Sequence, residues 1–216
     1  MRPSYWLFDI SSSFATDGGY CVEPRARKPG LGNRGDSVFY FCGNAEVPLI
    51  HIRNAREGEA ELLSEIGVRA WQKAMATIGE GDAMVDAARS AFFNFVAGSW
   101  ITVTVIEWNG HAAGWAARET LDEKISDFWI DPAFTGHGLG TALLQDIEKD
   151  IAAQGFDTAM MQTHSGNSEA ISFFQKRGYT IHWLSIAYNP KLDRDVPSVG
   201  LSKALESNKD GPYGLV

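Results

Sequence analysis

The residues with the clearest chemical meaning are three glycines, Gly136, Gly138 and Gly140, in the segment Asp131-Pro-Ala-Phe-Thr-Gly-His-Gly-Leu-Gly-Thr-Ala-Leu-Leu144. They lie between an apolar stretch typical of a strand and a stretch with helical apolar spacing. A helix leaves its first four N–H groups without intrahelical partners and carries about half a positive charge at that end. Glycine has no Cβ, so a phosphate group can approach these donors closely. The segment therefore predicts a site for a phosphorylated cofactor.

Two other phosphate-binding motifs do not fit this segment. No Lys-Ser or Lys-Thr pair follows the glycines, which excludes the P-loop of nucleotide-hydrolysing proteins. No acidic residue on a matching second strand supports a dinucleotide-binding fold.

The composition limits the classes of partner. The chain has 216 residues, 44% of them apolar, and a formal net charge of −8, with no long run of Lys or Arg. A chain of this size holds one domain, or one domain with an appendage, around a full core. Basic stretches that would neutralise phosphates are missing, so we expect neither nucleic acid nor an anionic membrane as partner. An amine or another cation suits the acidic balance.

The cysteines and the N-terminus indicate a cytoplasmic protein. Cys21 and Cys42 lie outside any metal-ligand spacing and are too few for a secreted disulfide framework, so we expect no metal site. The first residues hold too short an apolar stretch for a signal peptide, and no run of about 18 apolar residues occurs.

The elements that must position the glycines lie in the middle part of the chain. Residues 1–46 are rich in Gly, Ser, Arg and Pro, and we expect an irregular extension there. Residues 47–205 show regular periodicity and form the expected domain. Residues 206–216 form a polar tail.

Periodicity within the domain predicts the order β α α β β β α β α β β. Helices are expected at about 56–77, 81–97, 139–154 and 167–177, and strands at about 48–53, 100–108, 111–119, 125–131, 157–163, 179–188 and 196–202. Asn109-Gly110 is the turn signal of a tight hairpin. Asn167 is a helix N-cap signal, and Gly178 is the stop signal of the same helix.

This order resembles that of the GNAT superfamily of N-acetyltransferases. The family's cofactor signature, Gln/Arg-x-x-Gly-x-Gly/Ala after a strand that ends in Val-x-Pro, is similar to residues 130–140. A second signature of the family is similar to Asn167, Ala170, Phe173-Phe174 and Gly178-Tyr179. The resemblance covers about residues 50–203. It implies an α/β (α+β) fold with a mixed central sheet of about seven strands and about four helices, in which the fourth and fifth strands splay apart.

The resemblance also implies acetyl-CoA as cosubstrate, with its pantetheine arm between the splayed strands. Phe128, Trp129 and Ile130 would offer backbone groups to the pantetheine and an N–H to the thioester oxygen, where charge develops during the reaction. Asn167 would bond the pantetheine, cap its helix, or do both. The pyrophosphate would lie on Thr135, Gly136, His137, Gly138, Leu139, Gly140 and Thr141.

Two positions near the expected cofactor depart from the family pattern. Thr135 stands where the family usually has Gln or Arg, so a side-chain contact to the phosphates is shortened or lost. Phe174 stands where many members carry a tyrosine that protonates the departing CoA thiolate. A thiol with a pKa of about 8.5 can leave as thiolate, so water or another hydroxyl could suffice. Tyr179 and Ser165 are the candidate acids.

The reaction also needs a base, because an alkyl amine with a pKa of about 10.4 attacks a thioester only as the free amine. Asp127 is the first candidate, since it lies near the splay where some amine-acetylating relatives use a carboxylate. His164, at the end of the fifth strand, is the second candidate. Further alternatives on neighbouring strands are Glu107, Glu119 and Asp122.

The leading hypothesis is acetyl transfer from acetyl-CoA to a primary amine of a small molecule, by direct attack in a ternary complex. A non-catalytic acyl-CoA-binding sensor is one alternative, which Phe174 favours. A protein lysine or N-terminal acetyltransferase is another, although Gln162 falls where some protein-acetylating relatives place a catalytic Glu. Family members are often dimers, and the terminal strands at 179–202 could extend across a partner to form a homodimer.

Overall fold

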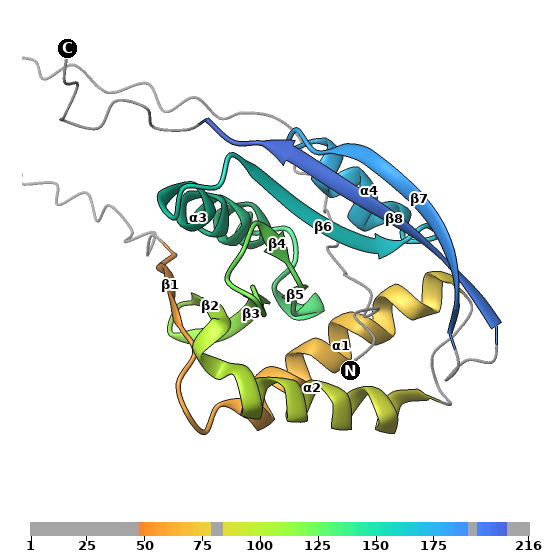
Figure 1. Ribbon diagram of the computed structural model, residues 1–216. Helices are drawn as coiled ribbons and strands as arrows, with labels where there is room; N and C mark the ends of the chain where they lie inside the picture. The colour runs from red at the N-terminus through yellow and green to blue at the C-terminus, as the bar shows by residue number, and fades with distance from the viewer. Residues whose placement is uncertain (1–47, 79–83, 190–193, 207–216) are drawn as a thin grey trace, which may run out of the picture.

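The computed structural model describes residues 48–78, 84–189 and 194–206 (Figure 1). The extension expected at residues 1–46, with both cysteines, and nearly all of the expected tail lie outside the described residues. The division of the chain at these boundaries therefore stays a prediction.

The described residues form eight strands and four α-helices in the expected order, with one strand divided in two. The strands are β1 (Ile50–Asn54), β2 (Val103–Trp108), β3 (His111–Ala117), β4 (Lys124–Ile125), β5 (Asp127–Ile130), β6 (Thr158–His164), β7 (Thr180–Asn189) and β8 (Arg194–Ala204). The helices are α1 (Ala60–Ile78), α2 (Val85–Ser99), α3 (Leu139–Ala153) and α4 (Ser168–Gln175). Short 3₁₀ turns occupy Trp100–Thr102 and Pro132–Phe134.

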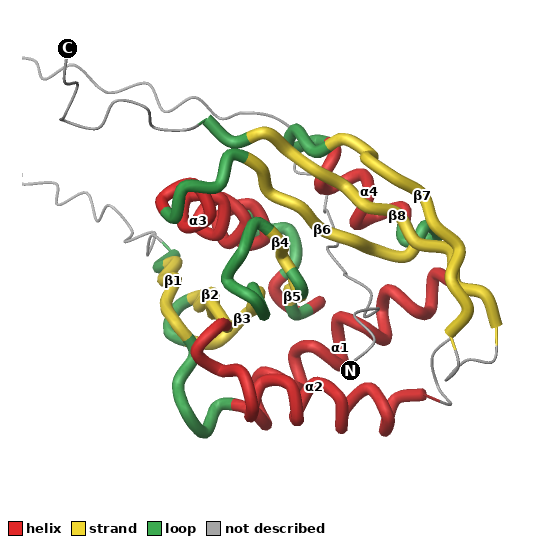
Figure 2. The backbone as a smooth tube through the Cα atoms, in the orientation of Figure 1, coloured by secondary structure: helices red, strands yellow, loops and turns green. Residues whose placement is uncertain are grey.

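The strands form two four-stranded sheets, with the orders β1-β2-β3-β5 and β4-β6-β8-β7. In Figure 2 the strands β6, β7 and β8 run together on one side of the molecule and β1, β2 and β3 lie on the other. All strand pairs are antiparallel except β4 with β6. Since only Ser126 separates β4 from β5, the single strand expected at 125–131 passes from one sheet to the other at this residue.

Helices cover the sheets on both faces, and the core has two parts. One part lies between the strands and α3 and α4, and it includes Phe128, Ile130 and Leu143. The other lies against α1 and α2, which pack alongside each other in Figure 1, and it includes Trp129 and Trp115. Alternate residues of β5 thus face opposite sides, as the pleat of a strand requires.

Local sequence signals set several element ends. Asn109 and Gly110 have φ values of 51° and 81°, the conformation of the expected tight hairpin turn between β2 and β3. The N–H of Ala170 donates to the Asn167 side chain at 3.1 Å, so Asn167 caps α4 as expected. Gly178 has φ 90°, as expected of a residue that ends a helix. Helix α1 begins later than expected because Gly58, with φ 93°, cannot continue a right-handed helix.

Candidate cofactor and catalytic site

The joint between the two sheets is the chain at Ser126, directly after β4, which pairs in parallel with β6 through Lys124–Ile125 and Met160–Met161. Beyond this joint β5 pairs with β3, whereas β6 pairs with β8. Within residues 48–78, 84–189 and 194–206, no strand pairing connects β5 to β6. The facing edges of the two strands therefore separate, as the splayed pair of the expected fold does.

The separation begins at a β-bulge. Ala117 is the register partner of Asp127, and its carbonyl oxygen also accepts a hydrogen bond from the N–H of Ser126 at 2.9 Å. Two consecutive residues thus face one residue of β3, which is the pattern of a bulge. A bulge bends its own strand, so β5 turns away from β6.

The backbone of β5 presents polar groups to the space beside β6. In an antiparallel pair, residues that bond to the neighbouring strand alternate with residues whose N–H and C=O point away from it. The N–H of Asp131 donates to the carbonyl of Ala113 at 2.9 Å, so odd-numbered residues here bond toward β3. Phe128 and Ile130 therefore direct their backbone groups toward β6. Trp129, which we had expected with them, directs its backbone toward β3.

The edge of β6 faces β5 with the same alternation. The N–H of Met160 donates to the carbonyl of Glu123 at 2.8 Å, and the N–H of Ser165 donates to Pro197 on the β8 side at 3.0 Å. The backbone N–H and C=O groups of even-numbered residues of β6 therefore point toward β4 and β5. Past the joint these residues are Gln162 and His164. The two strand edges together offer donors and acceptors to an extended ligand between them.

The glycine turn after β5 exposes the N-terminus of α3. Gly136 and Gly138 have φ values of 84° and 76°, in the left-handed region that side chains disfavour. Gly138 is the N-cap of α3, and no side chain caps this end. Gly140 is buried within the first turn. The first N–H groups of α3 are thus arranged for an anion.

The side chains of the turn bond back to the chain. The Thr135 hydroxyl donates to the Pro132 carbonyl at 3.0 Å, and a ring nitrogen of His137 lies 3.1 Å from the Phe134 carbonyl oxygen. The His137 ring also packs 4.8 Å from the ring of Trp108. The short side chain of Thr135 therefore stabilises the turn in place of the long polar contact that the family residue would make.

Asp127 lies at the start of β5 and faces the same side as Trp129, toward α1 and α2. Its side chain accepts a hydrogen bond from the Trp129 indole N–H at 3.2 Å. The residue is 8% exposed, and burial raises the pKa of Asp127 to about 7. A carboxyl group with this pKa exchanges a proton readily near neutral pH.

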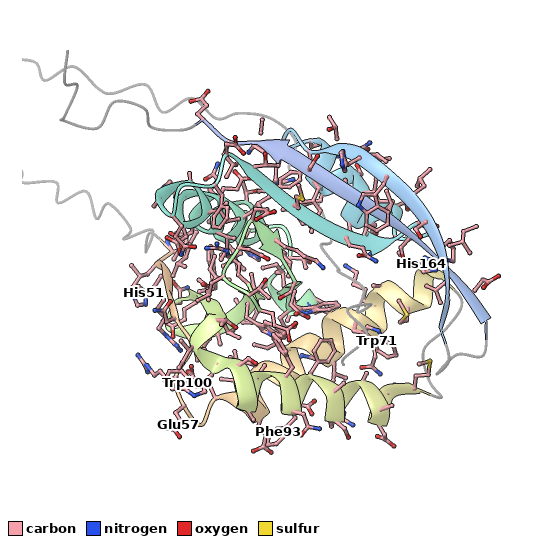
Figure 3. The ribbon with its side chains drawn as sticks, in the orientation of Figure 1. His51, Glu57, Trp71, Phe93, Trp100 and His164 are labelled. Atoms are coloured by element: carbon pink, nitrogen blue, oxygen red, sulfur yellow. The ribbon has the colours of Figure 1, made fainter. Side chains whose placement is uncertain are left out.

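His164 lies at the end of β6, far along the strand from the joint (Figure 3). Its Nδ1 accepts a hydrogen bond from the Gly166 N–H at 2.9 Å, so the proton of the neutral ring is on Nε2. Burial lowers the pKa of His164. The ring therefore has a donor available and no free lone pair for a proton, which disfavours it as the base.

Tyr179 is buried in the core between strands and α3. Its ring packs edge-on against Phe174 at 5.3 Å, and Phe174 in turn lies 5.8 Å from Phe128 of β5. The Tyr179 hydroxyl makes no hydrogen bond of ordinary length within the described residues, and burial together with the nearby Glu148 carboxylate raises the pKa of Tyr179. Phe174 thus separates the tyrosine from β5, which disfavours Tyr179 as the acid. Ser165 is exposed.

Among the other candidate bases, Glu119 adjoins the splay: its N–H donates to the Ser126 hydroxyl at 3.2 Å, and its charge adds to the rise in the pKa of Asp127. Glu107 accepts hydrogen bonds from His51 at 3.1 Å and Arg53 at 2.8 Å, and these bonds lower the pKa of Glu107. Asp122 accepts a hydrogen bond from the Lys124 N–H at 2.9 Å within the turn before β4. Glu119 is exposed.

One contact near the site escaped the sequence analysis. Arg69 of α1 donates to Asp131 through Nη2 at 2.5 Å and Nε at 3.1 Å, and the Asp131 side chain also accepts from the Ala133 N–H at 3.0 Å. This ion pair holds α1 over the end of β5. The residues are 62 positions apart, and nothing in their local sequence pairs them.

A mixed sheet that parts between two central strands, followed by a glycine-capped helix, defines the acyl-CoA N-acyltransferase fold. The chain belongs to the acetyltransferase (GNAT) family, whose family model matches residues 66–179, more than half of the chain.

Relatives agree with this assignment. The chain is 28% identical over 87 residues to the ribosomal protein bS18-alanine N-acetyltransferase of Escherichia coli (strain K12), a match of 39% of this chain and 59% of that protein. The chain thus spans less than two thirds of the length of the curated relatives it matches.

Two solved structures share the fold. The PaiA N-acetyltransferase from Thermoplasma acidophilum, in complex with coenzyme A, has a TM-score of 0.59 at 17% identity, over 72% of this chain and 99% of that one. A GCN5-related N-acetyltransferase from Rhodopseudomonas palustris has a TM-score of 0.59 at 19% identity, over 72% and 95%.

None of the helices within residues 48–78, 84–189 and 194–206 is long and apolar enough to cross a membrane. No group of three or more His, Cys, Asp or Glu side chains in this part of the chain could hold a metal ion.

Proposed function

We propose that the protein transfers the acetyl group of acetyl-CoA to a primary amine of a small molecule, by direct attack in a ternary complex. The observation that carries this proposal has two parts. The facing edges of β5 and β6 have no strand between them, and the N-terminus of α3, which no side chain caps, lies after the end of β5. An extended pantetheine arm with a diphosphate at its end has matching polar groups in the same order.

In this proposal the cofactor acts as an added strand between β5 and β6. Phe128 and Ile130 supply N–H groups, one of them to the thioester oxygen. Such a donor stabilises the oxyanion of the tetrahedral intermediate, where loss of one donor typically costs about 10²–10³ in rate. Gln162 and His164 supply backbone groups from the opposite edge. The N–H groups from Gly136 to Thr141 hold the diphosphate.

Asp127 is the proposed base. Its carboxylate attracts the ammonium form of the acceptor and takes its proton, and the free amine then attacks the carbonyl carbon of the thioester. The C–N bond forms, the positively charged nitrogen of the tetrahedral intermediate releases its second proton to water, and the intermediate collapses as the C–S bond breaks. CoA leaves as thiolate and takes a proton from water, because Phe174 has none to donate and the hydroxyl of Tyr179 is buried behind it.

A protein N-terminus is the second candidate acceptor. The E. coli relative is, by its name, an acetyltransferase for an alanine of ribosomal protein bS18. Gln162 in the position of a catalytic Glu favours the small amine over this alternative, since an amide cannot accept the proton.

A panel of acceptors tests these proposals. Release of free thiol from acetyl-CoA is followed with small alkyl and aryl amines, polyamines, lysine peptides and a peptide with N-terminal alanine. We expect turnover on one or more small amines. Turnover confined to peptides would overturn the small-amine acceptor, and binding of acetyl-CoA without turnover on any of them would identify a sensor.

We also propose a homodimer through β7. This strand forms the edge of its sheet and exposes four apolar side chains, Ile181, Trp183, Leu184 and Ile186. Exposed apolar edge strands are sites of pairing with another chain. Light scattering should give twice the mass of the chain, and Leu184→Lys should restore the monomer. A monomeric wild type would contradict the proposal.

A further inference from the structure

Arg177 links the end of α4 to the first turn of α3. Its Nε donates to the Thr141 hydroxyl oxygen at 3.1 Å, and its Nη2 donates to the same oxygen. Its Nη1 donates to the Phe173 carbonyl at 2.8 Å, and the guanidinium lies 3.4 Å from the centroid of the Phe173 ring. The guanidinium is therefore fixed from several sides beside the glycine turn.

These bonds determine which way the Thr141 hydroxyl can act. A hydroxyl has one hydrogen to donate and two lone pairs that accept. Two N–H groups of Arg177 donate to the lone pairs of the Thr141 hydroxyl oxygen. The hydroxyl hydrogen can therefore be donated to a further acceptor. Thr141 lies in the first turn of α3, among the N–H groups that face outward from the helix end. A phosphate oxygen there would complete its hydrogen bonding.

The fold accounts for part of the charge of Arg177: it follows the C-terminus of α4, where a cation is favourable, and Glu148 lies close enough to attract it. The N-terminus of α3 acts in the opposite sense. A cation near a helix N-terminus is unfavourable, because the helix dipole is positive at that end. Arg177 forms no ion pair with any carboxylate in the described part of the chain. The nearby Glu148 is bound to Lys203 at 2.7 Å. An anion at the N-terminus of α3 would offset the repulsion from this helix end and would add to the interactions that already hold the guanidinium.

We propose that Arg177 is a positioning residue for the diphosphate of the cofactor: it orients the Thr141 hydroxyl toward a phosphate oxygen and supplies the positive charge that Thr135 does not. The inference rests on the proposed function, since it concerns the same cofactor. It assigns to α4 a task that the family pattern gives to position 135, whose hydroxyl here is bonded to Pro132.

Binding of three donors by isothermal titration tests this role. Acetyl-CoA carries the diphosphate and the 3′-phosphate, acetyl-dephospho-CoA carries only the diphosphate, and S-acetylpantetheine carries neither. We expect Arg177→Gln to weaken binding of the first two donors by about 10- to 100-fold, because charge-assisted hydrogen bonds are lost. Binding of S-acetylpantetheine should not change. Arg177→Lys, which keeps the charge without the planar fork, should fall between.

Two further variants separate this role from a structural one. Lys149→Gln removes the same charge from an exposed position of α3 and should leave all three affinities unchanged. Thr141→Val removes the hydroxyl at constant shape, and it should lose less affinity in the Arg177→Gln background than in the wild type. This variant also carries the test if Arg177→Gln does not fold.

Each result has one meaning. Unchanged acetyl-CoA affinity in Arg177→Gln would overturn the inference and leave the proposed function intact. Equal losses for all three donors would show a structural role and would also overturn it. A loss for acetyl-CoA alone would assign Arg177 to the 3′-phosphate instead. A wild type that binds none of the donors would refute the proposed function itself.

Discussion

The proposed cofactor side of the site is built from backbone, whereas the proposed catalytic side is built from side chains. On the first side, Phe128, Ile130 and the first turn of α3 offer N–H groups whose direction follows from strand register and from two left-handed glycines. On the second, the roles of Asp127 and His164 depend on burial and on single hydrogen bonds. A backbone site tolerates many sequences, while a side-chain site changes its chemistry with one neighbour.

The largest expected effect is on the side-chain half. Asp127→Asn should lower kcat by about 10²–10⁴-fold, because an amide cannot take the proton of the ammonium acceptor. The dissociation constant of acetyl-CoA should stay the same, since the backbone of β5 is untouched. The matched control is Glu57→Gln, which removes an exposed carboxylate before α1 and should change kcat by less than about twofold. Equal kcat in wild type and Asp127→Asn would remove Asp127 from the mechanism.

The pH dependence sharpens the same point. Burial raises the pKa of Asp127 to about 7, and the base works only as carboxylate. Below that pH the carboxylate fraction falls about tenfold per pH unit, so kcat/KM should rise with pH and level near pH 7. Asp127→Asn can react only with acceptor that is already free amine, and this fraction rises about tenfold per pH unit up to about pH 10.4, so its profile should show no break near pH 7. A wild-type profile that rises through pH 7 without a break would contradict the assignment.

The next largest effect is expected on the stability of β5, the strand whose backbone N–H groups are the proposed donors. A Cβ at Gly114 would lie 2.6 Å from the Trp129 carbonyl oxygen and from Ile130 Cδ1, so Gly114→Ala should push β5 away from β3. We expect the free energy of unfolding to drop by about 1–3 kcal/mol, measured by denaturant titration. At Gly98 in α2 an added Cβ meets nothing within 4 Å. Gly98→Ala should therefore be neutral or stabilising, and equal losses would sink the explanation.

A smaller effect is expected at the helix end. Gly138→Ala forces a side chain into the left-handed region at about 1–2 kcal/mol and narrows the approach to the N–H groups of α3. Acetyl-CoA binding should weaken about tenfold. Gly155, after the last turn of α3, has φ 92° and equally open space. Gly155→Ala carries the same strain without a ligand nearby, so a comparable loss of affinity there would mean that strain alone is responsible.

The smallest expected effect is at Tyr179. Tyr179→Phe removes a buried hydroxyl that makes no hydrogen bond of ordinary length in the described residues, so kcat should change by less than about twofold. The melting temperature should stay the same or rise slightly. If kcat fell by about 10²–10⁴-fold, Tyr179 would be the acid after all, and the side-chain half would extend into the core.

The sequence predicts the backbone half well, because its determinants are local. The order of elements, the Asn109-Gly110 turn, the Asn167 cap and the glycine end of α3 each follow from a few adjacent residues. The family resemblance implies that the strands splay beyond a bulge, but it does not place that bulge at Ser126, since its position depends on the register of β5 against β3 and leaves no mark in apolar periodicity. Strand 125–131 therefore appeared continuous.

The side-chain half needed the three-dimensional structure. The bond from Gly166 to His164 fixes which nitrogen holds the proton, and the packing of Phe174 decides what Tyr179 can reach. Arg177 and Thr141 are 36 positions apart, and Arg69 and Asp131 are 62 apart. Contacts between residues so far apart in the sequence depend on how the elements pack, and a local sequence pattern does not predict that packing.

The joint between the sheets also has a consequence for the life of the protein. The chain at Ser126 and the core beneath the strands connect the two sheets, and no strand pairing joins β5 to β6 within the described residues, so a donor lying between them would add hydrogen bonds across this gap. A ligand that binds the folded chain and not the unfolded one adds about 2.7 kcal/mol of stability at a hundredfold excess over its dissociation constant. Resistance to proteolysis would then rise and fall with the supply of acetyl-CoA, and the amount of enzyme would follow the metabolic state of the cell.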